Sequence, residues 1–280
     1  MKTISLYNGS LLVEFDEGAH VYTCNGERWA NVSSAGDAID CGKSQGFIWW
    51  AVNEMWDWLE PKIGQVLTRE DLCDGRTAHQ RKKEEAAGVG RLVHDYLDAH
   101  LKAKMTFGDP PALPNDERAQ TAIRAYLQYE SEHRIHYLAS EQIVASLQHR
   151  YIGTLDNLNN VATVDDQLAI NDYKTSKSIR KGYRPQLAGY CMAWNEMHPD
   201  RPIWRRVIHK LPTDEEQSYY AYDCKYNGMT DEESTRFDFN AFLCALWLKH
   251  QWDPLVEAHM PADKAKKKDR TKGKTRKVAA

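Results

Sequence analysis

The sequence has no long hydrophobic segment. No run of about 18 apolar residues occurs, which excludes a membrane-spanning helix. The first residues, MKTISLYNGSLLVEF, lack the continuous apolar stretch and small-residue cleavage site of a signal peptide. Of the 280 residues, 42% are hydrophobic and 28% are charged, which is the composition of a globular protein in water. We therefore expect a cytoplasmic protein that makes no contact with a membrane.

Paired cysteines and nucleotide-binding loops are also missing. The chain has six cysteines and no C-x-x-C pair, which argues against a zinc ribbon and suits reduced thiols. No G-x-x-x-x-G-K-[ST] motif occurs, so we expect no ATP-driven motor in this chain.

Basic residues are concentrated at one end of the chain. Residues 261–280 hold nine Lys or Arg against Asp263 and Asp269, which gives this tail a net charge of about +7. The whole chain has a net charge of -3. The remaining chain is therefore acidic, at about -10. A basic tail without aromatics is expected to be disordered and suits contact with a polyanion, although a tail that serves only solubility is the alternative.

Local patterns predict a hairpin and helices in the first half. Asn25-Gly26 is a hairpin turn signal within residues 10–32, and Ser33 or Ser34 could cap a following helix. Hydrophobic spacing then predicts helices over 45–60, 76–104 and 116–134.

The second half alternates between strands and helices. Strands are expected over 137–148, 151–163, 167–176, 204–211 and 218–225, with helices over 183–197 and about 235–250. This order predicts an α/β protein with a central mixed β-sheet flanked by helices. We expect one domain over 1–260, with the hairpin and helical part at 1–134, the sheet core at 135–255, and the tail at 261–280.

Opposite charges stand two residues apart at the end of one apolar strand. Asp172 and Lys174, in NDYKTSK, share one face because strand side chains alternate. A three-residue turn over 164–166 would set Asp156 of the preceding strand opposite Lys174, on that same face. A two-residue turn at Asp165-Asp166 would turn Asp156 away, so we predict the odd-length turn or a bulge.

Such a group favours metal chemistry. Two converging carboxylates repel each other, and Mg²⁺ or Mn²⁺ neutralises them well because both ions prefer oxygen ligands. A neighbouring lysine could orient or deprotonate a water and stabilise charge on a phosphoryl oxygen. An isolated D-x-K pair, however, is more often an exposed ion pair worth roughly 0–1 kcal/mol.

Four further motifs accompany D-Y-K-T: a G-x-x-x-H, a strand acid, a G-x-x-D and a Q-x-x-x-Y. They are formed, in chain order, by Gly90 and His94, by Glu141, by Gly153 and Asp156, and by Gln186 and Tyr190. Together they resemble the RecB-like branch of the PD-(D/E)XK nuclease superfamily, and in particular stand-alone phage exonucleases. The resemblance covers roughly residues 15–250.

The resemblance implies a restriction-endonuclease-like core and a role for each motif residue. Asp156 and Asp172 would bind the Mg²⁺ or Mn²⁺ ion, with the carbonyl of Tyr173 as a further ligand. Lys174 would be the catalytic lysine, and His94 would approach or bind the metal.

Other motif positions would support these residues. Gln186 would position the attacked phosphate or the water, and Tyr190 would contact the DNA backbone or brace the site. Glu141 matches a motif acid that could support the metal ligands without binding the metal itself. The second metal-binding acid is Asp172 rather than the commoner Glu. The cysteines do not match the four-cysteine pattern of relatives with an iron–sulfur cluster, so we expect no such cluster.

Basic and aromatic residues outside these motifs have competing interpretations. Lys177, Arg180 and Lys181 follow the D-Y-K-T strand and are candidates for binding phosphates. Arg205-Arg206 is expected at a solvated strand edge. Trp49, Val52 and Trp56 follow helical spacing, which predicts core packing, with base stacking as the alternative.

The resemblance therefore predicts a metal-dependent DNA exonuclease. It would act on single- or double-stranded DNA ends in phage recombination, replication or DNA processing, in the host cytoplasm, with a separate annealing or recombination protein as a further partner. An endonuclease of the same fold is one alternative. The other is an inactive module that binds DNA or recruits a partner.

Overall fold

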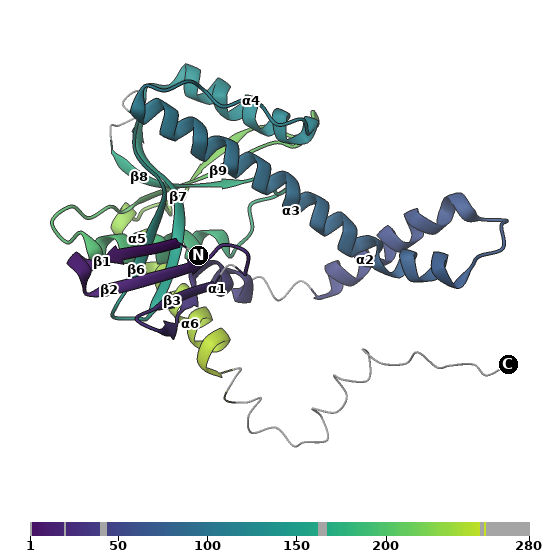
Figure 1. Ribbon diagram of the computed structural model, residues 1–280, viewed down its shortest axis with the longest axis horizontal. Helices are drawn as coiled ribbons and strands as arrows, with labels where there is room; N and C mark the ends of the chain where they lie inside the picture. Colours follow the sequence, from purple (N-terminus) through teal and green to yellow (C-terminus); the bar gives the residue numbers. More distant parts are fainter. Residues whose placement is uncertain (1, 20, 40–43, 162–166, 253–254, 256–280) are drawn as a thin grey trace.

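The computed structural model describes residues 2–19, 21–39, 44–161, 167–252 and 255. It has an N-terminal antiparallel sheet, a helical middle, and a mixed central sheet flanked by helices (Figure 1). The predicted α/β class is therefore confirmed at this level. The predicted turn over 164–166 and the basic tail 261–280 lie outside the described residues.

The N-terminal sheet is larger than the predicted hairpin. It consists of β1 (Lys2–Leu6), β2 (Leu11–Asp16), β3 (Val21–Cys24) and β4 (Glu27–Arg28), paired antiparallel in that order. Asn25 and Gly26 have φ of 49° and 81°, as a tight turn between β3 and β4 requires, so this turn is confirmed. Strand β1 was not predicted.

The N-terminal sheet shares a hydrophobic core with the central sheet. Leu11, Val13 and Tyr22 pack with Ile143, Ala145 and Ile152. The hydroxyl groups of Tyr7 and Tyr22 also reach the central sheet, at 2.8 Å from the carbonyl oxygen of Ala145 and 2.7 Å from Oγ1 of Thr154.

The central sheet is a meander followed by a crossover. Strands β6 (Ile135–Ser146), β7 (Tyr151–Val161) and β8 (Leu168–Lys174) are antiparallel neighbours. Helix α5 (Tyr183–Met197) then leads to β9 (Arg205–Lys210), parallel to β8, and β10 (Tyr220–Asp223) pairs with β9. The short strand β5 (Ala30–Asn31) pairs with the beginning of β7.

Helices pack to form two separate cores. Helices α3 (Arg69–Thr106) and α4 (Glu117–Glu132) pack around Leu97, Ile123 and Tyr126 together with Tyr173 of β8. Helices α1 (Val32–Ile39), α5 and α6 (Asp231–Trp247) pack with Tyr151 and Leu155 of β7. The cap of α1 is Asn31, which accepts from the backbone N–H of Ser33, and not Ser33 or Ser34 as predicted.

Helix α2 (Ser44–Leu59) pairs with the first turns of α3 in an arm that projects from the rest of the protein (Figure 1). Trp50 packs edge-on against His79, and Trp58 contacts Gly75. Trp49, Val52 and Trp56 lie on the outer side and are exposed, so their predicted core packing is wrong. The predicted helix is present, but no described residue packs against the face of α2 that these three side chains form.

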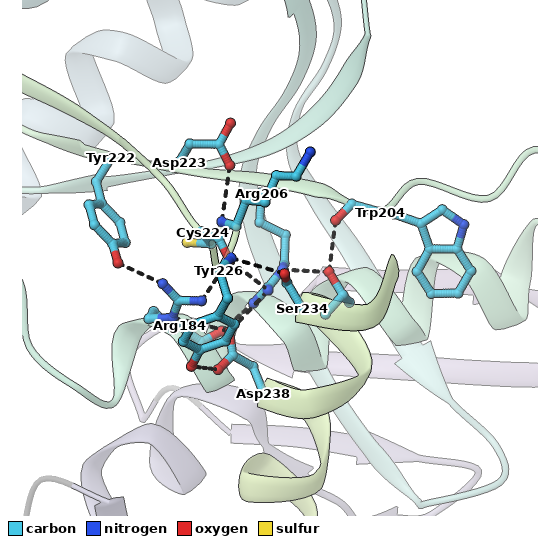
Figure 2. Close-up of polar contacts among 11 residues, drawn as sticks. Arg184, Trp204, Arg206, Tyr222, Asp223, Cys224, Tyr226, Ser234 and Asp238 are labelled. Atoms are coloured by element: carbon cyan, nitrogen blue, oxygen red, sulfur yellow. Dashed lines mark hydrogen bonds and ion pairs between the residues drawn. The ribbon is translucent and has the colours of Figure 1, made fainter. Parts of the chain in front are cut away.

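A buried ion network joins α5, β9, β10 and α6 (Figure 2). Asp238 of α6 lies 3.0 Å from Nη2 of Arg206 and 3.2 Å from Nε of Arg184. Arg206 also donates to Oγ1 of Thr235, and Arg184 to the hydroxyl of Tyr222. Arg206 is therefore buried beneath the sheet, which corrects the expectation of a solvated edge, and the network fixes the beginning of α5.

Candidate metal centre

Three side chains from three elements converge on one point. His94 of α3, Glu141 of β6 and Asp156 of β7 each offer a ligand atom, and these atoms lie within 4.8 Å of one another. We call these three residues the metal group. His94 and Asp156 were predicted to bind the metal, whereas Glu141 was predicted to support the ligands without binding the metal itself.

The pairing of β6 with β7 brings Glu141 beside Asp156. Ser140 pairs with Asn157 and Gln142 with Leu155, so Glu141 lies between these pairs. Its φ is 48°, a left-handed conformation that is strained for a non-glycine residue. Backbone strain of this kind is concentrated at functional sites, and no sequence pattern indicated it here.

The register between β7 and β8 places Asp156 and Asp172 on the same side of the sheet. Asn157 pairs with Asn171, and one further step along this register sets Asp156 opposite Asp172. The predicted common face is therefore confirmed, but the predicted partner, Lys174, is wrong by two residues. The cause is the register: the numbers of paired residues add up to 328, from Asn160 and Leu168 onwards, and not to the 330 that the predicted turn would give.

The two strands diverge where the site forms. Pairing between β7 and β8 ends at Asn157, while β5 pairs with β7 at Tyr151 and Ile152. Beyond that end, Oδ2 of Asp156 accepts a hydrogen bond from the backbone N–H of Tyr173 at 2.7 Å. A side-chain carboxylate thus takes the place of a backbone acceptor and is held between the strands.

Helix α3 brings His94 against β8. A Cβ added at Gly90 would lie 3.3 Å from Oγ1 of Thr175, so glycine at this position allows the helix to approach closely. Nε2 of His94 lies 3.0 Å from the carbonyl oxygen of Tyr173, which can only accept, so Nε2 carries the proton. Nδ1 lies 3.5 Å from Oδ1 of Asp156 and is directed into the metal group.

Acidic residues dominate the electrostatics of the metal group. Burial would lower the pKa of His94, but the Asp156 carboxylate outweighs it and raises that pKa to about 9. Burial, with the charge of Asp156, raises the pKa of Glu141 to about 8. Burial would raise the pKa of Asp156, yet His94 and Lys174 hold it below its usual value. A divalent cation would relieve this crowding of carboxylates.

Asp172 and Lys174 form a buried ion pair next to the metal group. Nζ of Lys174 lies 2.6 Å from Oδ2 of Asp172 and 4.9 Å from the ring of Tyr183. Burial, together with the charge of Asp156, raises the pKa of Asp172 to about 6, although Lys174 counteracts this. Burial would lower the pKa of Lys174, but the two aspartates raise it, so the amine is protonated.

The Q-x-x-x-Y motif lies beneath the acids. Nε2 of Gln186 donates to the hydroxyl of Tyr190 at 3.2 Å, and both side chains are buried. A Cβ at Gly153 would come within 2.7 Å of Tyr190, so the glycine of G-x-x-D makes room for this ring. The buried position of Tyr190 favours the bracing role over a contact with the DNA backbone.

The metal group opens into a cavity of about 620 Å³ between α3 and the N-terminal sheet. His94 and Glu141 line it, together with the basic residues Lys2, Arg91 and Lys102 and the acids Glu17, Asp95 and Asp98. Lys102 is paired with Asp98 at 2.6 Å. The three basic residues were not predicted from the sequence. Helical spacing could have found two of them, because Arg91 and Lys102 are eleven residues apart and so share a face of α3 with His94. Lys2 belongs to the strand that was not predicted.

The predicted phosphate-binding residues lie in the connection from β8 to α5. Lys177, Arg180 and Lys181 are exposed there. The guanidinium of Arg180 lies 5.9 Å from the ring of Tyr183, on which Lys174 also packs. This basic segment is therefore adjacent to Lys174, and Tyr183 is a connecting residue that no motif identified.

The metal group could hold an ion, and its donors fit a divalent cation that accepts oxygen ligands. Two carboxylates and one imidazole suit Mn²⁺ well and Mg²⁺ less well, because Mg²⁺ seldom takes a nitrogen ligand. Asp172 lies nearby but is paired with Lys174 instead of joining the group. The backbone carbonyl of Tyr173, assigned to the metal from sequence, faces Nε2 of His94.

Comparisons with known proteins give little further information. No family model and no curated protein matches the chain. A crystal structure of SSO0001 is similar at 10% sequence identity and a TM-score of 0.25, over 72% of this chain and 87% of that one. Among the described residues, none of the helices combines the length and the hydropathy of a membrane-spanning segment.

Proposed function

We propose that this protein is a metal-dependent DNA exonuclease of the PD-(D/E)XK type, with a restriction-endonuclease-like core. The observation that carries the proposal is the convergence of the predicted motifs. His94, Glu141 and Asp156 form one group, with Asp172 and Lys174 beside it, although these residues come from four separate elements. A cross-strand ion pair alone would not require a histidine and a third acid in the same place.

Each residue has a role that its contacts support. His94, Glu141 and Asp156 would hold Mg²⁺ or Mn²⁺, with Asp172 available as a further oxygen ligand. The bound cation would supply Lewis-acid polarisation of a phosphoryl oxygen and lower the pKa of a bound water. Nε2 of His94 keeps its proton and donates to the carbonyl oxygen of Tyr173, and this hydrogen bond orients Nδ1 towards Asp156.

Lys174 is suited to stabilise negative charge. Its amine is protonated in this structure because two aspartates surround it. It would therefore stabilise the charge that develops on the phosphoryl oxygens, and not accept a proton while Asp172 is ionised beside it. Arg91 in the cavity would bind the DNA phosphates, together with the exposed residues Lys177, Arg180 and Lys181 that follow β8.

The test is digestion of end-labelled linear single- and double-stranded DNA with Mg²⁺, Mn²⁺ or EDTA. We expect digestion with either metal, none with EDTA, and a loss of at least ~100-fold in Lys174→Ala and Asp156→Asn. DNA binding should persist in both variants. Lys225→Ala is the matched control, because Lys225 forms an ion pair with Asp231 at 3.8 Å outside the site.

Digestion by Lys174→Ala or Asp156→Asn at the wild-type rate would refute the proposal. Cleavage of closed circular DNA would indicate an endonuclease of the same fold. DNA binding without cleavage under any metal condition would indicate an inactive binding module.

A further inference from the structure

The outer face of α2 is apolar and exposed along its length. Exposed fractions are 58% for Ile48, 69% for Trp49, 47% for Val52, 39% for Met55 and 57% for Trp56. The inner face packs on α3 through Trp50 and through an ion pair between Glu54 and Lys82 at 3.2 Å. The outer side chains are thus not needed to fold the arm, and in the described part of the chain nothing packs on them.

The spacing of these residues is that of a helix that pairs with another helix. Ile48, Val52 and Met55 are separated by four and three residues, so they lie on one face of the helix, as residues that contact a partner helix do. Trp49 and Trp56 are one heptad apart and flank this row on the same side. We call these five residues the α2 seam.

Charge does not favour a nucleic acid or an anionic membrane on this face. Residues 44–83 contain six acids (Glu54, Asp57, Glu60, Glu70, Asp71, Asp74) and six bases (Lys62, Arg69, Arg76, Arg81, Lys82, Lys83), so the arm is neutral overall. Two of these bases contact α2 itself, because Lys82 pairs with Glu54 and Arg81 packs on the ring of Trp58. The α2 seam carries no charge, so it offers no electrostatic attraction to phosphates or acidic lipid headgroups.

The area of the seam reaches the lower end of what a specific interface needs. The exposed parts of these side chains amount to on the order of 600 Å² per chain, since a large aromatic side chain covers about 150–250 Å² in full. If the contact covered all of this area, two copies would bury on the order of 1,200 Å², the lower end of specific stable interfaces. An uncharged seam is also self-complementary, as a twofold contact requires.

We propose that the α2 seam binds the α2 seam of a second copy of this chain, so that the protein is a dimer joined through its projecting arms. This inference does not depend on nuclease activity, because the seam and the metal group are on different parts of the molecule (Figure 1).

The test is the mass of the full chain in solution, by light scattering and sedimentation over a range of concentrations. Wild type should have twice the chain mass of 32.2 kDa. Val52→Glu should raise the dimer dissociation constant at least ~100-fold, because the twofold contact would bury two unpaired carboxylates. Leu12→Glu is the matched control, since Leu12 is 46% exposed on the N-terminal sheet, and it should stay dimeric.

Hydrogen exchange gives an independent measurement on the unmodified protein. The amides of residues 48–56 should become more protected as the concentration rises through the dimer transition. A monomeric wild type, or a dimer that Val52→Glu leaves intact in folded protein, would overturn the inference. So would a monomer that binds neutral phosphatidylcholine vesicles or single-stranded DNA through Val52 and Trp56, which would assign the seam to a membrane or to base stacking.

Discussion

Glycines decide how closely the elements of the site approach one another. Gly90 lies against Thr175, and Gly153 lies against Tyr190 and Val32. In the sequence these glycines are the first residues of the G-x-x-x-H and G-x-x-D motifs, and the motifs do not explain why glycine is needed. In the structure they are the points where a Cβ would separate α3 from β8, or β7 from α5.

Gly153→Ala should destabilise the fold by about 1–3 kcal/mol. The reason is that the added Cβ would lie 2.7 Å from a ring carbon of Tyr190, which is closer than two carbon atoms can pack. Urea unfolding measures this. Gly46→Ala is the control, since a Cβ there meets nothing within 4 Å, and it should change stability by less than about 1 kcal/mol. Equal effects in the two variants would mean that Gly153 is not sterically required.

At the level of elements, the buried ion network holds α5, β9 and α6 together beneath the site. Arg206 and Arg184 share the carboxylate of Asp238, and Arg206 also donates to the backbone carbonyl oxygen of Arg184 (Figure 2). This network sets where α5 begins, and Gln186 lies in the first turn of that helix.

Arg206→Ala should cost about 3–5 kcal/mol, because the Asp238 carboxylate loses a buried partner. Lys225→Ala is the control, because Lys225 is exposed and its ion pair with Asp231 at 3.8 Å is worth about 0–1 kcal/mol. Urea unfolding of the two variants should separate them clearly. A loss in Lys225→Ala as large as that in Arg206→Ala would contradict a special role for the network.

Across the whole molecule, the metal group connects parts that are far apart in the chain. His94 belongs to the helical middle, whereas Glu141 and Asp156 belong to the central sheet. A cation held by all three would therefore bind the folded chain and not the unfolded one, and so stabilise the whole domain.

Mn²⁺ at about 100 times its dissociation constant should stabilise the fold by about 2.7 kcal/mol and raise the melting temperature by roughly 5 °C. Glu141→Gln should lose most of this shift. Asp223→Asn, an exposed acid away from the group, should keep it. If Glu141→Gln responds to Mn²⁺ as wild type does, Glu141 is not a ligand.

The sequence alone determined the order of the main elements and the motif residues of the site. Strand alternation and helical spacing are local properties, so they predicted α3, the meander of β6 to β8 and α5. The common side of Asp156 and Asp172 followed only from the choice of an odd-length turn. The exact register of β7 and β8 and the strained backbone of Glu141 were not predictable in this way, because both depend on how strands pair.

The tertiary structure decided which acids meet. It joined Glu141 to His94 and Asp156, paired Asp172 with Lys174, buried Arg206 and left the tryptophan face of α2 exposed. Periodicity marks an apolar or charged face, but only the packing of other elements determines whether that face lies in a core, in a cavity or on the surface.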